Sequence, residues 1–216
     1  MAGARGPRRP FTGRRVLLGV TGGIAAYKAI TVARELTLYG AEVDVVLTPN
    51  ALEFVRPMAF EAVTGRPAHT MPYAPGDPLA HIRLAREARA VVVAPATANF
   101  LARAAAGMAD DLLTTVLLAT EAPVVLAPAM NDRMYAHPQT QANLRHLAGL
   151  GYRIAGPAVG PLAWGEGEGP GRLLEPEEIV SHAGRALEEA TLAGRRVVVT
   201  AGPTREPIDP VRFIGN

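Results

Sequence analysis

The chain has 216 residues, of which 49% are hydrophobic and 19% are charged, and its formal net charge is +2. This balance predicts a folded globular protein with one good core and excludes an intrinsically disordered chain. Cysteine is absent, which excludes disulfides and thiolate metal sites, and no metal site is expected. No apolar run has the length of a membrane span or the form of a secretory signal, so we expect a cytoplasmic protein without membrane contact.

The first 15 residues carry five arginines and no acid, among several glycines and prolines. A basic segment of this composition is typical of a disordered tail, which we expect over residues 1–14. Contact with nucleic acid is the less favoured interpretation of the same arginines, and we predict no nucleic-acid partner.

From Arg15 onward, apolar strands alternate with helical segments. Strands are expected at 15–20, 42–47, 90–94, 124–127 and 152–155, and helical segments at 24–38, 50–63, 97–106, 110–119, 137–150 and 176–193. Residues 66–77 are predicted to be turns, and residues 159–172 a glycine-rich loop. Such alternation is typical of an α/β fold with a doubly wound parallel sheet, a three-layer Rossmann or flavodoxin-like arrangement. We expect this domain over residues 15–193 and a truncated second domain over residues 194–216, which opens with a βα unit at 196–200.

The first two strands are each followed by a loop that could hold a phosphate-containing ligand. Gly22-Gly23-Ile24 offers bare backbone amides and close approach, although a plain strand–helix turn explains these residues equally well. The second strand ends in Thr48 and Asn50, without the acid that would bind the ribose of a dinucleotide. A mononucleotide therefore fits this pattern better than NAD.

Two further loops follow the next strands of the predicted sheet. Residues 95–99, PATAN, combine small side chains with one hydroxyl and one amide, and Thr97 could instead cap the next helix. Asn131 follows the strand at 124–127 and suits a grip on a carboxylate or amide, because its side chain has donors and no net charge. These loops should converge on the edge where open α/β sheets bind ligands, and this convergence favours a ligand site.

Other polar residues have a functional and a structural interpretation. His81 could act as a general base or could be an ordinary surface or capping histidine. Arg172, at the end of the glycine-rich loop, could pair with an anion beneath a closing lid, or the loop could be a mere connection. Asp110 and Asp111 are interpreted as acids at a helix start.

Five segments together resemble, in sequence and order, the homo-oligomeric flavin-containing cysteine decarboxylases. The segments are GGIAAYK at 22–28, PLAHI at 78–82, PATAN at 95–99, ADDLL at 109–113 and PAMNDRM at 128–134. The resemblance covers about residues 15–190 and is greatest to the branch that decarboxylates phosphopantothenoylcysteine in coenzyme A biosynthesis. Residues 197–216 resemble the opening of phosphopantothenate–cysteine ligase, which bacteria commonly fuse to the decarboxylase. The chain ends before the nucleotide-binding and lysine region of that ligase, so no ligase activity is expected.

The resemblance implies FMN as cofactor, a small-molecule substrate and a catalytic base, His81, within reach of Asn131. Asn131, Met134 and Arg172 are expected to bind the substrate. The residues expected to hold FMN are Gly22, Gly23, Ile24, Thr48, Asn50, Ala96, Thr97, Ala98, Asn99 and Ala129. Because members of this family are trimers or tetramers of trimers with FMN between subunits, a homotrimer or homododecamer is expected, with part of the site drawn from another chain.

In the mechanism that the resemblance implies, FMN oxidises the cysteinyl thiol to a thioaldehyde, CO2 leaves and reduced FMN returns the electrons. The family has a Leu-Ala-Cys-Gly segment whose cysteine protonates the enethiolate, whereas this chain has Leu162-Ala163-Trp164-Gly165. We expect a normal net reaction in which Glu166, Glu168 or solvent supplies the proton. The open alternative is an enzyme that releases only the oxidised enethiol.

Two functions from other classes remain as alternatives. A non-catalytic FMN-binding subunit is favoured by the missing cysteine. A flavin prenyltransferase shares the fold, but Asn131 and the ligase-like tail argue against it. A simple NAD dehydrogenase is disfavoured because the ribose-binding acid is absent.

Overall fold

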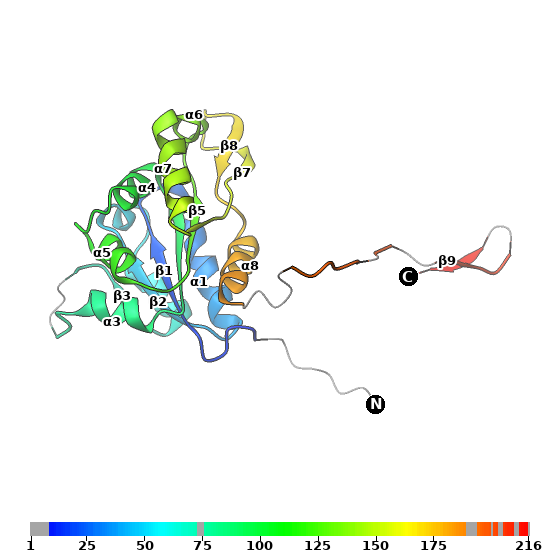
Figure 1. Cartoon of the computed structure of the whole chain (residues 1–216), viewed down its shortest axis with the longest axis horizontal. Helices are drawn as coiled ribbons and strands as arrows, with labels where there is room; N and C mark the ends of the chain where they lie inside the picture. The colour runs from blue at the N-terminus through cyan, green and yellow to red at the C-terminus, as the bar shows by residue number, and fades with distance from the viewer. Residues whose placement is uncertain are drawn as a thin grey trace.

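Six parallel strands form the central sheet, in the order β3-β2-β1-β4-β5-β6 (Figure 1). This computed structural model describes residues 9–72, 76–188, 194–199, 201–202, 205–209 and 212–215. The strands are β1 (Arg15–Val20), β2 (Glu42–Leu47), β3 (Ala68–His69), β4 (Ala90–Ala96), β5 (Val124–Pro128) and β6 (Arg153–Ile154). This strand order is that of a Rossmann fold and reverses between β1 and β4. The predicted doubly wound α/β fold is confirmed.

Helices cover both faces of the sheet and bury its alternating apolar side chains. One face packs against α1 (Lys28–Leu38), α2 (Pro57–Thr64) and α8 (Pro176–Leu187), and the other against α3 (Ala80–Glu87), α4 (Ala98–Ala105), α5 (Leu112–Ala119) and α7 (Pro138–Gly149). Leu18 of β1 belongs to the first core and Leu17 to the second, as the two-residue period of a strand requires. A Cβ at Gly19 would lie 2.5 Å from Leu113 Cδ1, so glycine lets α5 approach β1 closely.

Two predicted helices are each divided in the structure. Residues 24–38 form a 3-10 turn, η1 (Ile24–Tyr27), followed by α1, and residues 50–63 form η2 (Pro49–Glu53) and α2. Pro57 opens α2 because proline fits the first turn of a helix but breaks its interior. The sequence did not indicate the short strand β3 or the short helix α6 (Asp132–Ala136).

The predicted glycine-rich loop is wrong, because residues 158–172 form an antiparallel hairpin. Its strands are β7 (Ala158–Pro161) and β8 (Glu168–Arg172), and Leu162 N donates to Gly167 O at 2.9 Å across the tip. Packing against the loop after β5 supports β8, since Met130 N donates to Gly171 O at 3.0 Å. A Cβ at Gly171 would come within 2.1 Å of Met130 O, so only glycine permits this contact.

The ends of the chain differ from expectation where they are described. Phe11 is only 2% exposed and its N–H donates to Tyr39 O, so residues 9–14 are ordered, while residues 1–8 lie outside the described part. The helix predicted to reach residue 193 ends at Leu187, and residues 189–193 are not described. Residues 196–199 form no strand where a βα unit was expected, and β9 (Arg205–Pro207) pairs with β10 (Phe213–Gly215) instead. No helix in the described ranges is long and apolar enough to cross a membrane.

Candidate functional site

A cavity of about 1060 Å³ lies at the carboxyl ends of β1, β2, β4 and β5, where the strand order reverses. The hairpin β7–β8 forms another part of its wall. The predicted residues that line it are Gly22, Gly23, Ile24, Thr48, Asn50, Thr97, Ala98, Asn99, Ala129, Asn131, Met134 and Arg172. The predicted convergence of the strand-end loops is therefore observed, and only Ala96 and His81 of the predicted set lie elsewhere.

The two glycines after β1 bring neighbouring loops together. A Cβ at Gly22 would lie 2.5 Å from Asn50 Cβ, and one at Gly23 would lie 3.4 Å from Thr97 Cγ2. The loops after β1, β2 and β4 thus touch around the glycines. This contact gives Gly22 a structural role whether or not a ligand binds, and it leaves the backbone at the cavity wall accessible.

Two threonines link the ends of β1 and β4. Thr21 is buried, its hydroxyl donates to Pro95 O at 2.7 Å, and its oxygen accepts from Thr97 N at 3.2 Å. Thr97 Oγ1 accepts from Phe100 N at 3.4 Å, so the alternative interpretation of Thr97 as a helix cap is correct. Thr21 was not predicted as a site residue, although a hydroxyl at the end of an apolar strand is a detectable signal.

Asn131 reaches the cavity with its amide donors available. Its Oδ1 accepts from Arg133 N at 2.9 Å and caps α6, which fixes the orientation of the amide. No described residue accepts a hydrogen bond from Asn131 Nδ2. The side-chain oxygen of Asn131 is thus occupied by the cap of α6, and its NH2 group remains free to bind a carboxylate.

Ala96 does not face the cavity. It is fully buried in the core beneath α4 and α5, and its carbonyl accepts from Ala129 N at 3.2 Å. Ala96 was predicted as a ligand contact because it lies inside the PATAN segment. In the structure it is the last residue of β4, and it fixes the loop that carries Asn131.

His81 does not line the cavity of its own chain, so a single chain does not bring it to the cavity that contains Asn131. It lies in the first turn of α3, which packs against α5. In Figure 1, α3 lies at the lower left of the part formed by the six-stranded sheet and its helices, and the hairpin β7–β8 lies at the upper right of that part. This separation could not be predicted, because the alternation of strands and helices does not determine where each helix N-terminus lies.

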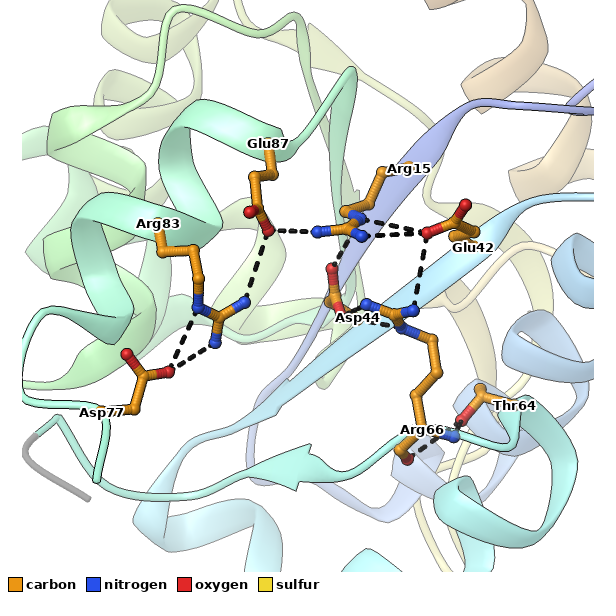
Figure 2. A network of polar contacts seen from close by, with 8 residues as sticks. All are labelled: Arg15, Glu42, Asp44, Thr64, Arg66, Asp77, Arg83 and Glu87. Atoms are coloured by element: carbon orange, nitrogen blue, oxygen red, sulfur yellow. Dashed lines mark hydrogen bonds and ion pairs between the residues drawn. The ribbon is translucent and has the colours of Figure 1, made fainter. Parts of the chain in front are cut away.

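A network of ion pairs holds α3 to β1 and β2 of the sheet (Figure 2). Arg83 of α3 bonds Asp77 at 2.5 Å, and Glu87 of the same helix bonds Arg15 at the start of β1. Glu42 in turn accepts from Arg15 at 3.0 Å. The hydrogen bond to Glu42 raises the pKa of Arg15, and the same bond lowers the pKa of Glu42.

The centre of this network is Asp44 of β2, which is only 3% exposed. Arg66 donates to Asp44 Oδ1 through Nε at 3.0 Å and Nη2 at 2.8 Å, and Arg15 Nε lies 3.6 Å from Asp44 Oδ2. The buried carboxylate is therefore fully compensated, as the low dielectric of the interior requires.

Several charged residues of the cavity were not predicted as ligand contacts. Asp111 caps α5 by accepting from Thr114 N at 2.8 Å, as expected of a helix-start acid, but it also lines the cavity. Its Oδ2 lies 2.9 Å from Arg103 Nη1. Burial alone would lower the pKa of Arg103, but its bonds to Asp110 and Asp111 outweigh burial and raise it.

The tip of the hairpin contributes one acid to the cavity. Glu166 lines the cavity, whereas Trp164 is fully exposed and, like Glu168, is absent from the lining. Gly165 and Gly167, with φ values of 82° and 79°, form the turn on either side of Glu166. Within the described residues, Glu166 forms no recorded ion pair.

The family models match nearly the whole chain in two segments. The Flavoprotein model matches residues 5–187, and the model of the DNA/pantothenate metabolism flavoprotein C-terminal domain matches residues 192–216. The coenzyme A biosynthesis bifunctional protein CoaBC of Vibrio cholerae is 50% identical over 208 residues, which are 95% of this chain and 52% of that protein. The CoaBC protein of Mycolicibacterium smegmatis is also 50% identical, over 94% of this chain and 50% of its own length. The chain thus spans about half the length of these relatives.

Solved structures agree with these matches. The FMN-dependent cysteine decarboxylase SpaF is 37% identical with a TM-score of 0.70, and the match covers 82% of this chain and 99% of SpaF. A PPC decarboxylase variant complexed with pantothenoylaminoethenethiol is 33% identical with a TM-score of 0.70, over 78% of this chain and 95% of that one. The resemblance found in the sequence is confirmed, and the chain belongs to the flavoprotein family.

Proposed function

We propose that this chain catalyses the FMN-dependent decarboxylation of 4′-phosphopantothenoylcysteine to 4′-phosphopantetheine, a carboxy-lyase step of coenzyme A biosynthesis. The observation that carries the proposal is the free amide of Asn131 at the wall of a cofactor-sized cavity. The names of the CoaBC relatives and of the PPC decarboxylase neighbour support the substrate. The proposal includes a cytoplasmic location, and it assigns residues 15–193 to the decarboxylase and residues 194–216 to the start of a ligase domain.

The cavity residues fit FMN. Its volume suits a ligand of this size, and glycine and alanine on its wall leave room for a flat ring system. Thr48, Asn50 and Asn99 offer polar side chains that form no recorded hydrogen bond among the described residues. SpaF and the FMN-binding protein AtHal3, 34% identical with a TM-score of 0.68, are named for this cofactor. Bound FMN would supply the redox chemistry that makes the cysteinyl carbon able to release CO2.

The substrate is held by its reacting carboxylate. The NH2 group of Asn131 donates to that carboxylate, and the bond from Arg133 N keeps the amide from rotating away. Met134 provides an apolar wall, and Arg172 at the base of the hairpin attracts the anionic substrate. An uncharged donor suits this role, because the grip must loosen when the carboxylate becomes CO2.

His81 acts as the base from a neighbouring subunit in a homotrimer or homododecamer. Its absence from the lining of its own chain's cavity supports this role, as does the ion-pair network that fixes α3. Large apolar side chains are exposed at both places: Leu79 is 62% exposed beside His81, and Ile24 is 67% exposed at the cavity. Burial of these side chains between copies of the chain would stabilise the assembly.

Glu166 donates the proton that reduction of the enethiol product requires. Its position on the cavity lining supports this role and disfavours Trp164 and Glu168. The Glu166 carboxyl gives its proton to the carbon that has lost CO2, and bound reduced flavin would supply the two electrons and the second hydrogen as a hydride. The release of enethiol alone remains a second candidate outcome, because no cysteine is available.

Incubation of the FMN-loaded protein with phosphopantothenoylcysteine tests the proposal. We expect CO2 release and a product with the mass of 4′-phosphopantetheine. Bound flavin without CO2 release would indicate a non-catalytic FMN-binding subunit instead. A product two hydrogens lighter would keep the decarboxylation but contradict the role of Glu166.

A further inference from the structure

Two cations at the base of the hairpin share a single carboxylate. Lys28 Nζ, at the start of α1, lies 3.2 Å from both Oε1 and Oε2 of Glu175. Arg172 at the end of β8 also bonds Glu175 Oε1 through Nη2. Lys28 and Arg172 line the cavity, whereas Glu175 is not part of the lining.

The cluster keeps one uncompensated positive charge inside the cavity wall. Arg103, the other cation of the lining, is matched by both Asp110 and Asp111. The side chain of Lys28 is only 16% exposed, so its charge is poorly screened by water. An anion at Lys28 and Arg172 would therefore be attracted more strongly than an anion elsewhere on the cavity wall.

We propose that Lys28 and Arg172 form a subsite for a phosphate monoester, and that Glu175 keeps the two cations together when no ligand is bound. A guanidinium fork and an ammonium group are the side chains best suited to phosphate oxygens. This inference rests on the proposed function, whose cofactor and substrate both carry such a phosphate. Because Lys28 belongs to α1 and Arg172 to the hairpin, a bound phosphate also ties the hairpin to the body of the protein.

Chemical labelling tests the subsite directly, because Lys28 is the only lysine of the chain. Reductive methylation of the protein without flavin modifies Lys28 and the terminal amine, and peptide mass spectrometry separates the two. The ligands are two matched pairs, FMN with riboflavin and 4′-phosphopantothenate with pantothenate. We expect the phosphorylated member of one pair to slow Lys28 methylation at least about tenfold relative to its partner.

The pair that protects Lys28 identifies the source of the phosphate. Protection by FMN alone assigns the subsite to the cofactor, and protection by phosphopantothenate alone assigns it to the substrate. If both phosphorylated ligands bind, by flavin fluorescence and calorimetry, while Lys28 methylation stays unchanged, the subsite is wrong and the proposed function stands. If neither pair binds, the proposed function fails and the subsite with it.

Substitutions provide an independent measurement. Lys28→Met should lower the affinity for the phosphorylated ligand of the protected pair about 10- to 100-fold. The affinity for the unphosphorylated ligand of that pair should fall less than about twofold. Lys28→Arg should retain most of the preference for the phosphorylated ligand. Arg34→Met removes an exposed positive charge from the same helix and should change neither affinity. Equal weakening of both partners by Lys28→Met would show a general structural role and overturn the subsite.

Discussion

The ion-pair network and the cavity are two polar regions toward opposite ends of β1, and they differ in how far their polar groups are paired. In the network, Asp44 is compensated by Arg15 and Arg66, and Arg83 and Glu87 of α3 are paired as well (Figure 2). In the cavity, the NH2 group of Asn131 has no hydrogen-bond partner among the described residues, and neither has the carboxylate of Glu166. Paired polar groups hold a structure together, whereas unpaired ones at a cavity wall are available to a ligand.

The largest expected effect follows from changing Asn131 to Asp. A carboxylate there would repel the substrate carboxylate and remove its donors, so CO2 release should fall about 1000-fold. The melting temperature and the flavin content should stay close to those of the unchanged protein. Asn143→Asp makes the same chemical change on α7, away from the cavity lining, and should leave CO2 release intact. Near-normal CO2 release by the Asn131 variant would remove the basis of the assigned site.

A second large effect tests whether His81 serves the cavity of another subunit. His81→Ala and Asn131→Asp should each abolish CO2 release alone, because each lacks one half of every site. Co-expressed, they should regain up to about a quarter of normal activity, since one site in four in a random ring combines both intact residues. Mixed oligomers that contain both variants, verified by mass spectrometry, and still lack activity would exclude action between subunits.

A substitution in the ion-pair network should lower the stability of the protein and leave its ligand binding unchanged. Asp44→Ala removes the buried carboxylate that pairs with Arg15 and Arg66, and leaves both arginines with the more exposed Glu42. The expected loss is about 2 kcal/mol, below the value for a fully buried pair because both arginines are partly exposed. Thermal unfolding should shift down by several degrees, while the affinity of the folded protein for flavin should not change. Loss of flavin affinity without loss of stability would contradict the separation of the two regions.

The smallest expected effect concerns Glu35 of α1, whose Oε2 is buried without a hydrogen-bond partner in the described part of the chain. Burial, and secondly the charge of Glu177, raise the pKa of Glu35 above its usual 4.5. The folded state thus favours the protonated acid, and stability is lost as the pH rises through the folded pKa. Glu35→Gln should therefore raise the melting temperature at pH 7 by about 2–4 °C and change it little near pH 4. An equal rise in melting temperature at both pH values would exclude the ionisation of Glu35 as the cause.

The sequence was sufficient for the parts of the fold that depend on local pattern. The continuous apolar run at Val91, Val92 and Val93 predicts a buried parallel strand, and alternation with helices predicts the doubly wound sheet. The strand-end loops could be found because parallel strands bring their carboxyl ends to one edge. Such arguments hold wherever a residue's position follows from its own element.

The remaining features depend on contacts between distant segments. The hairpin could not be predicted, because glycine and proline disfavour strands, and β8 is stabilised by pairing with β7 and by its contact with Met130. The exclusion of Ala96 from the cavity depends on its bond to Ala129, one strand away. The place of His81 depends on the ion pairs of α3 with Asp77 and Arg15, which no local pattern indicates.

A crystal structure of the protein with FMN and a carboxylate-bearing substrate analogue tests the central claim most directly. The account predicts flavin in the cavity between β1 and β4, with the analogue's carboxylate within hydrogen-bond distance of Asn131 Nδ2. It also predicts the imidazole of a neighbouring subunit's His81 at the same ligand. Flavin bound elsewhere, or a carboxylate that does not contact Asn131, would contradict the account.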